Sequence, residues 1–198
     1  MQYHQLEVSG ERCLTATRDS TTYDLTSADE DLRTFGDLAR VAAIARIPID
    51  RLAAELTENA DVIDEEFVDQ HVTVPVDAEE VWAAGVTYQI SEQAREQESS
   101  MPDMYYDVYD ADRPEIFFKA TPSRTVEPGG AIGVRDDSQW DVPEPELGIV
   151  LRRGEIVGYT VGNDVSSRSI EGENPLYLPQ AKVYDRCCSL GPCVVTPD

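Results

Sequence analysis

Two glutamates separated by one proline, Glu144-Pro145-Glu146, stand at the start of the apolar run 147–151. Side chains at i and i+2 of a strand point to the same face, so both carboxylates are predicted to face one way. Two such charges repel unless a cation lies between them, and Mg²⁺ prefers carboxylate oxygens. Asp164 follows a second apolar stretch and is the predicted third ligand. The alternative is a chance acidic pair in an acidic chain.

The two lysines of the chain, Lys119 and Lys182, form a second group of candidate functional residues. They are the only lysines among sixteen basic residues, and Lys119 follows two phenylalanines. The ammonium group of lysine is a compact charge whose pKa changes readily on burial, which suits catalysis. The alternative is two ordinary surface lysines, but an apolar setting favours a functional role for both.

The composition is strongly acidic, with 39 Asp and Glu against 16 Lys and Arg and a formal charge of −23. This charge argues against a nucleic-acid partner, which requires a basic face. High acidity with almost no lysine is typical of a cytoplasmic protein from a high-salt environment, although an acidic mesophilic protein is also compatible. No apolar run approaches the roughly 20 residues of a membrane span, and no signal peptide is recognisable.

The four cysteines are Cys13, Cys187, Cys188 and Cys193. Their spacing does not resemble a zinc site, since paired Cys-x-x-Cys spacings and histidine partners are absent. Neighbouring cysteines of a strand also point to opposite faces and chelate poorly together. We interpret all four as small buried residues in a reducing compartment.

The pattern of apolar residues predicts a β-rich α+β protein with a boundary near Pro75 and Asp77. A small N-terminal domain, 1–76, is expected to contain one or two hairpins within 1–30, helices over 34–45 and 49–56, and an extended segment at 72–76. A catalytic domain, 77–198, is expected to contain a buried strand at 81–86, strands at 116–119, 140–151, 155–161 and 193–195, and a loop at 125–132. The polar segment 91–113 is either a mobile lid or a surface insertion.

Several enzyme classes are excluded by missing motifs. There is no glycine-rich nucleotide loop and no Gly-x-Ser-x-Gly elbow. The two histidines, His4 and His71, lie outside the predicted catalytic domain, which argues against a Ser-His-Asp arrangement.

Four motifs together resemble the fumarylacetoacetate hydrolase family: DVPEPELG from 141, GYTVGNDVSSR from 158, QAK from 180 and LGP from 190. The resemblance implies a mixed β-sandwich roll and Mg²⁺ or Mn²⁺ bound by Glu144, Glu146 and Asp164. In this family the domain carries further strands beyond the point where this chain stops, so the chain is expected either to be incomplete or to need a partner that closes the sheet.

Two further segments, VYDADRPEIFFKATP from 108 and ENPLYLPQAK from 173, resemble the 2-keto-3-deoxy-D-arabinonate dehydratase branch of this family. That substrate is the same compound as 2-keto-3-deoxy-D-xylonate. The resemblance implies that Glu115 and Lys182 are catalytic, and that Lys119 and Tyr88 bind substrate. For Glu115 the alternative is an ion pair with an arginine such as Arg113.

The expected reaction is a Mg²⁺-dependent dehydration of this keto-sugar acid to 2,5-dioxopentanoate in pentose oxidation. The metal is expected to act as a Lewis acid, with Glu115 as acid or base and Lys182 stabilising charge near the keto acid. Members of the family commonly form homo-oligomers. The alternatives are a family hydrolase or oxo-acid decarboxylase, disfavoured because the segment after the first strand lacks the family's histidine, and an inactive truncated relative.

Overall fold

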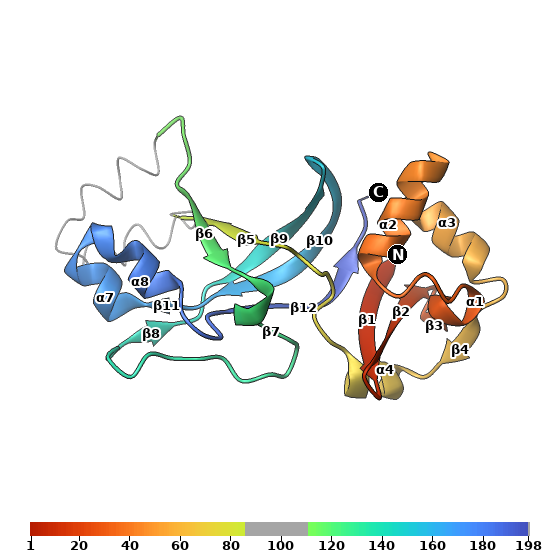
Figure 1. Ribbon diagram of the computed structural model, residues 1–198, viewed down its shortest axis with the longest axis horizontal. Helices are drawn as coiled ribbons and strands as arrows, with labels where there is room; N and C mark the ends of the chain where they lie inside the picture. Colours follow the sequence, from red (N-terminus) through yellow and green to blue (C-terminus); the bar gives the residue numbers. More distant parts are fainter. Residues whose placement is uncertain (86–110, 198) are drawn as a thin grey trace.

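The computed structural model describes residues 1–85 and 111–197 (Figure 1). Tyr88 and most of the predicted lid, 91–113, lie outside the described residues. The first part of the chain is a meander of β1 (Gln2–Val8), β2 (Glu11–Arg18), β3 (Thr21–Asp24) and β4 (Asp61–Ile63), in which each strand is antiparallel to the next. The hairpins predicted within 1–30 are therefore confirmed.

Four helices belong to this first part: α1 (Leu25–Ala28), α2 (Phe35–Ala45), α3 (Ile49–Leu56) and α4 (Glu65–His71). The hydroxyl of Thr34 caps α2 by accepting the N–H of Asp37 at 3.0 Å, and Arg46 ends the helix with a φ of 58°. The two helices predicted over 34–45 and 49–56 are confirmed.

The second part of the chain is built mainly of short strands: β5 (Val81–Ala84), β6 (Ile116–Ala120), β7 (Thr125–Val126), β8 (Asp141–Val142), β9 (Pro145–Arg152), β10 (Glu155–Asp164), β11 (Ser166–Ser167) and β12 (Cys188–Val195). The helices among its described residues are α7 (Arg168–Glu173), α8 (Leu178–Lys182) and the 3₁₀ turns η1 (Pro122–Arg124) and η2 (Pro175–Tyr177). The α+β, sheet-rich class predicted from the sequence is confirmed.

One sheet joins the two parts, with the strand order β4-β3-β2-β1-β12-β10-β9 and with β7 parallel to the start of β12. Figure 1 shows β12, in blue, running from the second part to the edge of β1. Val194 of β12 packs in the same buried cluster as Tyr3 and Phe35. Because burying one such side chain contributes about 1.5–3 kcal/mol, this cluster ties the last strand to the first part. The division at residue 76 stays a prediction.

Two strand predictions need correction. The segment 140–151 is not one strand, because β8 pairs with β11 whereas β9 pairs with β10. Pro143 lies between them and has no N–H for a ladder, so the chain changes sheets there. The strand predicted as buried at 81–86 is β5, but its Trp82 is 57% exposed. Within the described residues β5 pairs with β6 alone, so its other edge has no strand partner there.

One face of β9 is apolar, with Leu147, Ile149 and Leu151 all exposed. The inner face of the same strand carries the alternate residues, which are partly buried.

No helix of the described residues is long and apolar enough to cross a membrane. All four cysteines are free of disulfide bonds; Cys187 and Cys188 are buried as predicted, whereas Cys13 and Cys193 are partly exposed.

Candidate active site

Glu144 and Glu146 lie on the inner face at the start of β9. Burial along this strand alternates strictly from Pro145 onward, so Glu146 shares the partly buried side with Gly148 and Val150, and Glu144 precedes it by two residues. This is the common orientation that the Glu-Pro-Glu spacing predicts.

Asp164 comes next to Glu144 through the antiparallel pairing of β9 with β10. Gly162 is opposite Glu146, and Asn163 is opposite Pro145. The N–H of Asp164 donates to the carbonyl of Glu144 at 2.9 Å, and the N–H of Glu144 donates to Oδ1 of Asn163 at 3.0 Å. Residues twenty positions apart in the chain are thereby held side by side.

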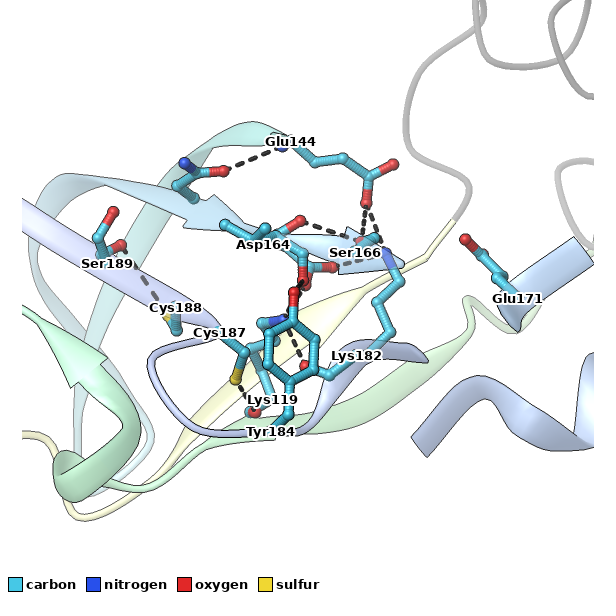
Figure 2. A network of polar contacts seen from close by, with 12 residues as sticks. Lys119, Glu144, Asp164, Ser166, Glu171, Lys182, Tyr184, Cys187, Cys188 and Ser189 are labelled. Atoms are coloured by element: carbon cyan, nitrogen blue, oxygen red, sulfur yellow. Dashed lines mark hydrogen bonds and ion pairs between the residues drawn. The ribbon is translucent and has the colours of Figure 1, made fainter. Parts of the chain in front are cut away.

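Lys182 reaches both carboxylates from the end of α8 (Figure 2). Its Nζ lies 2.5 Å from Oε2 of Glu144 and 2.9 Å from Oδ2 of Asp164. The side chain of Lys182 is almost fully buried, so these contacts replace water as its partners. Burial lowers the pKa of Lys182, but the charges of Asp164 and Glu144 outweigh burial and raise the pKa overall.

Lys119 contacts the same aspartate from β6. Its Nζ lies 2.6 Å from Oδ1 of Asp164 and donates to the carbonyls of Val165 at 2.9 Å and Lys182 at 2.5 Å. These partners are protein groups, which favours a role in holding Asp164. Substrate binding by Lys119 stays a prediction. Both lysines are buried, so the alternative of two ordinary surface lysines is wrong.

The pKa values of the two glutamates move apart. Burial raises the pKa of Glu144, but Lys182 and Arg168 outweigh it and bring that pKa down to about 2. Burial, reinforced by the charges of Asp164 and Glu144, raises the pKa of Glu146 to about 7. The negative charges of Asp164 and Glu144 therefore act on the carboxyl group of Glu146, and a bound cation would relieve this repulsion.

These three carboxylates fit a hard divalent cation, because the atoms that they can offer as ligands are all oxygens. Oδ1 of Asp164 is buried and accepts no well-directed hydrogen bond despite the nearby ammonium of Lys119, so it retains acceptor capacity. Among the described residues, however, no three acidic, histidine or cysteine side chains are gathered as a metal cluster. The assignment of Glu144, Glu146 and Asp164 as ligands stays a prediction.

Three residues that the sequence reasoning missed complete the network. Ser166 donates its hydroxyl to Oε2 of Glu144 at 3.0 Å. Arg168 donates to Oε1 of Glu144 at 2.7 Å and to Oε2 of Glu171 at 2.6 Å. Ser166 and Arg168 lie within the GYTVGNDVSSR motif, and Glu171 is three residues further along a helix, the spacing of facing side chains. That spacing was the signal available in the sequence.

Glu115 lies just before β6 and beside the end of β5. The N–H of Gly85 donates to its carbonyl at 3.0 Å. Its carboxylate lies directly over Gly85, where an added Cβ would stand 2.0 Å from Oε2. The glycine therefore leaves room for the glutamate side chain. Its catalytic role stays a prediction, as does substrate binding by Tyr88.

A hollow of about 640 Å³ lies between the β5–β6 pair and strands β9 and β10, and the exposed residues Leu147, Ile149 and Leu151 of β9 line part of it. Glu146, Asp164 and Lys119 line part of it, whereas most of the remaining described lining is apolar. Two of the three predicted metal ligands therefore face open space, as ligands that also meet a substrate must.

The family model described as fumarylacetoacetate (FAA) hydrolase C-terminal matches residues 80–198. The chain belongs to the fumarylacetoacetate hydrolase family. A Haloferax volcanii protein named "Probable 2-keto-3-deoxyxylonate dehydratase" is 88% identical over 198 residues, which are all of this chain and 68% of that protein. The 2-dehydro-3-deoxy-D-arabinonate dehydratase of Saccharolobus solfataricus is 51% identical over 135 residues, 66% of this chain and 45% of that protein.

Among solved structures, a 2-keto-3-deoxy-D-arabinonate dehydratase complexed with magnesium and 2,5-dioxopentanoate matches with a TM-score of 0.77 and 39% identity. The match covers 100% of this chain and 67% of that one. These similarities confirm the fold predicted from the family resemblance. They also support a lyase of the dehydratase type.

Proposed function

We propose that the protein dehydrates 2-keto-3-deoxy-D-xylonate, the same compound as 2-keto-3-deoxy-D-arabinonate, to 2,5-dioxopentanoate, with a divalent cation such as Mg²⁺. The observation that carries the proposal is the meeting of Glu144, Asp164 and Lys182, with Glu146 close by, in a chain 88% identical to a named dehydratase. The related structure that contains magnesium and 2,5-dioxopentanoate supports the same reaction.

In this proposal Glu144, Glu146 and Asp164 hold the cation, which supplies Lewis-acid polarisation of the keto group when bound. Removal of a proton from C3 and loss of the C4 hydroxyl with a proton release one water. A proton then leaves C5 and another returns to C3, which yields the C5 aldehyde after tautomerisation. The formula changes only by one water.

Glu115 is the proposed proton carrier for these steps, since a carboxylate within reach of the substrate can accept the C3 proton and donate to the leaving hydroxyl. Lys182 is the proposed partner for negative charge on the keto acid. Its ammonium is already positioned by Glu144 and Asp164, so little reorganisation is needed when that charge develops.

The metal half of the proposal is tested by calorimetric titration of the full-length protein with Mn²⁺ and with Mg²⁺ in high salt. Glu144→Ala removes one carboxylate and is expected to abolish binding, whereas Asp164→Asn keeps the shape and is expected to weaken it. Glu173→Ala, at the end of α7, is the matched control. Unchanged affinity in both site variants would remove these residues from the metal site.

The alternative activities are hydrolysis of an acylpyruvate and decarboxylation of oxaloacetate, which the family resemblance leaves open. Turnover of either compound without turnover of the sugar acid would reverse the proposal. An inactive protein would turn over none of the three, even with Mg²⁺ or Mn²⁺ present. A homo-oligomeric state also remains part of the proposal, and sedimentation of the full-length protein tests it separately.

A further inference from the structure

We infer that Arg168 is a positioning residue that fixes the orientation of Glu144 and thereby sets the affinity of the site for its divalent cation. This inference rests on the proposed function, because it takes Glu144 as a metal ligand. It concerns a residue that contacts the carboxylate and is not itself a ligand.

The first observation is that residues 163–168 contact every polar group of Glu144. Asn163 accepts its N–H, the N–H of Asp164 donates to its carbonyl, and Ser166 donates to its Oε2. Arg168 donates to Oε1 at 2.7 Å. The guanidinium thus binds Oε1 of Glu144, while Oε2 contacts Ser166 and Lys182. Oε2 is therefore the oxygen that shares the ammonium of Lys182 with Asp164.

The second observation is that Arg168 is itself held at both ends. Its backbone N–H donates to the carbonyl of Trp140 at 2.8 Å, at the first residue of α7. Its guanidinium bridges Glu144 and Glu171, and the side chains of Arg168 and Glu171 are 11% and 5% exposed. A planar group with two buried anionic partners cannot rotate without losing one of them.

The third observation is that charge alone does not explain the choice of arginine. Lys182 already supplies one positive charge to Glu144 at 2.5 Å. A lysine at position 168 would keep the net charge. Its single Nζ could not contact Glu144 and Glu171 through two separate nitrogen atoms, as the guanidinium does. The fork geometry of the guanidinium is therefore the property that position 168 uses.

The test is a titration of the full-length protein with Mn²⁺ alone, without any sugar acid. Arg168→Lys preserves charge and is expected to weaken Mn²⁺ binding by about 10–100-fold, the usual cost of removing a group that orients a metal ligand. Glu171→Gln, which loosens the far end of the guanidinium, is expected to weaken it in the same direction. Arg51→Lys on α3, an exposed arginine paired with Glu55, is the matched control.

A purely structural role would lower the melting temperature without a specific effect on the metal. The inference instead predicts that excess Mn²⁺ restores product formation by Arg168→Lys to near the wild-type rate. Wild-type Mn²⁺ affinity in Arg168→Lys, or an activity loss that excess Mn²⁺ does not restore, would overturn the inference alone. A wild-type protein that binds neither Mn²⁺ nor Mg²⁺ would overturn the proposed metal site and this inference with it.

Discussion

Lys119 and Asp164 form an ion pair in which both side chains are nearly inaccessible, with Nζ 2.6 Å from Oδ1 and exposures of 1% and 6%. The two residues come from different strands, β6 and β10, 45 positions apart. The pair therefore joins the β5–β6 sheet to the large sheet at the candidate active site, which couples the stability of the fold to the geometry of the site.

Replacing Lys119 by methionine is expected to lower the free energy of unfolding by about 3 kcal/mol. Breaking a buried pair leaves an uncompensated charge, at a cost of about 3–5 kcal/mol, and the remaining contact of Asp164 with Lys182 favours the lower end. Urea denaturation in high salt measures this change, with Arg51→Met as the exposed control. A loss below about 1 kcal/mol would mean that Lys119 is not essential to this junction.

Gly85→Ala should damage catalysis while leaving the fold intact. The new Cβ would stand 2.0 Å from Oε2 of Glu115, and the flexible glutamate side chain must move away. If Glu115 transfers protons, the rate constant kcat should fall at least tenfold, because positioned proton transfer contributes about 10²–10⁴-fold. Gly36→Ala, where the nearest contact is an ordinary 3.6 Å, is the control. An unchanged kcat would argue against a catalytic Glu115.

Asp50 should make stability depend on pH in the acid range. Burial raises its pKa, but hydrogen bonds from the terminal ammonium, Thr196 and Tyr3 outweigh burial and bring the pKa below its ordinary 3.8. A lowered folded-state pKa stabilises the protein above the ordinary pKa, and this contribution disappears as the pH falls through the folded-state value. The melting temperatures of wild type and Asp50→Asn should differ most near pH 7 and converge as the pH falls below the ordinary carboxyl pKa.

A difference between the two proteins that is constant with pH would show that the ionised form of Asp50 is not what matters. Asp19→Asn is the control for this comparison. Its side chain is 89% exposed, so removing its charge should change the pH profile little.

Salt should stabilise the protein. The formal charge of −23 repels itself over about 10 Å at 0.1 M salt but only about 3 Å at 1 M. Raising NaCl from about 0.05 M to about 2 M should therefore raise the melting temperature, and the 88% identity to a Haloferax protein agrees with this expectation. A neutral osmolyte controls for effects on hydrophobic burial. A flat or falling melting temperature would contradict the high-salt interpretation.

Local patterns predicted those parts of the fold that depend on neighbours in the sequence. The helix predicted over 34–45 is α2, which Thr34 caps, and the strand predicted over 155–161 lies within β10. The prediction of a single strand over 140–151 is wrong, because the change of sheet at Pro143 depends on the strand with which each half pairs. The exposure of Trp82 likewise depends on what lies opposite β5.

The orientation of Glu144 and Glu146 followed from the two-residue period of a strand. The contact of Arg168 with Glu144 did not, because it depends on where α7 begins relative to β9, a tertiary relation that residue spacing does not contain. The tight burial of Lys119 was foreseeable from its two phenylalanine neighbours, but its partner Asp164 was not.

The most direct test of the proposed function is mass spectrometry of the product formed from 2-keto-3-deoxy-D-xylonate by the full-length protein in high salt. We expect 2,5-dioxopentanoate in the presence of Mg²⁺, little of it after chelation, and recovery when Mg²⁺ is restored. The Glu115→Gln variant should be slower by at least tenfold. A correctly folded, Mg²⁺-saturated protein that forms no 2,5-dioxopentanoate would contradict it.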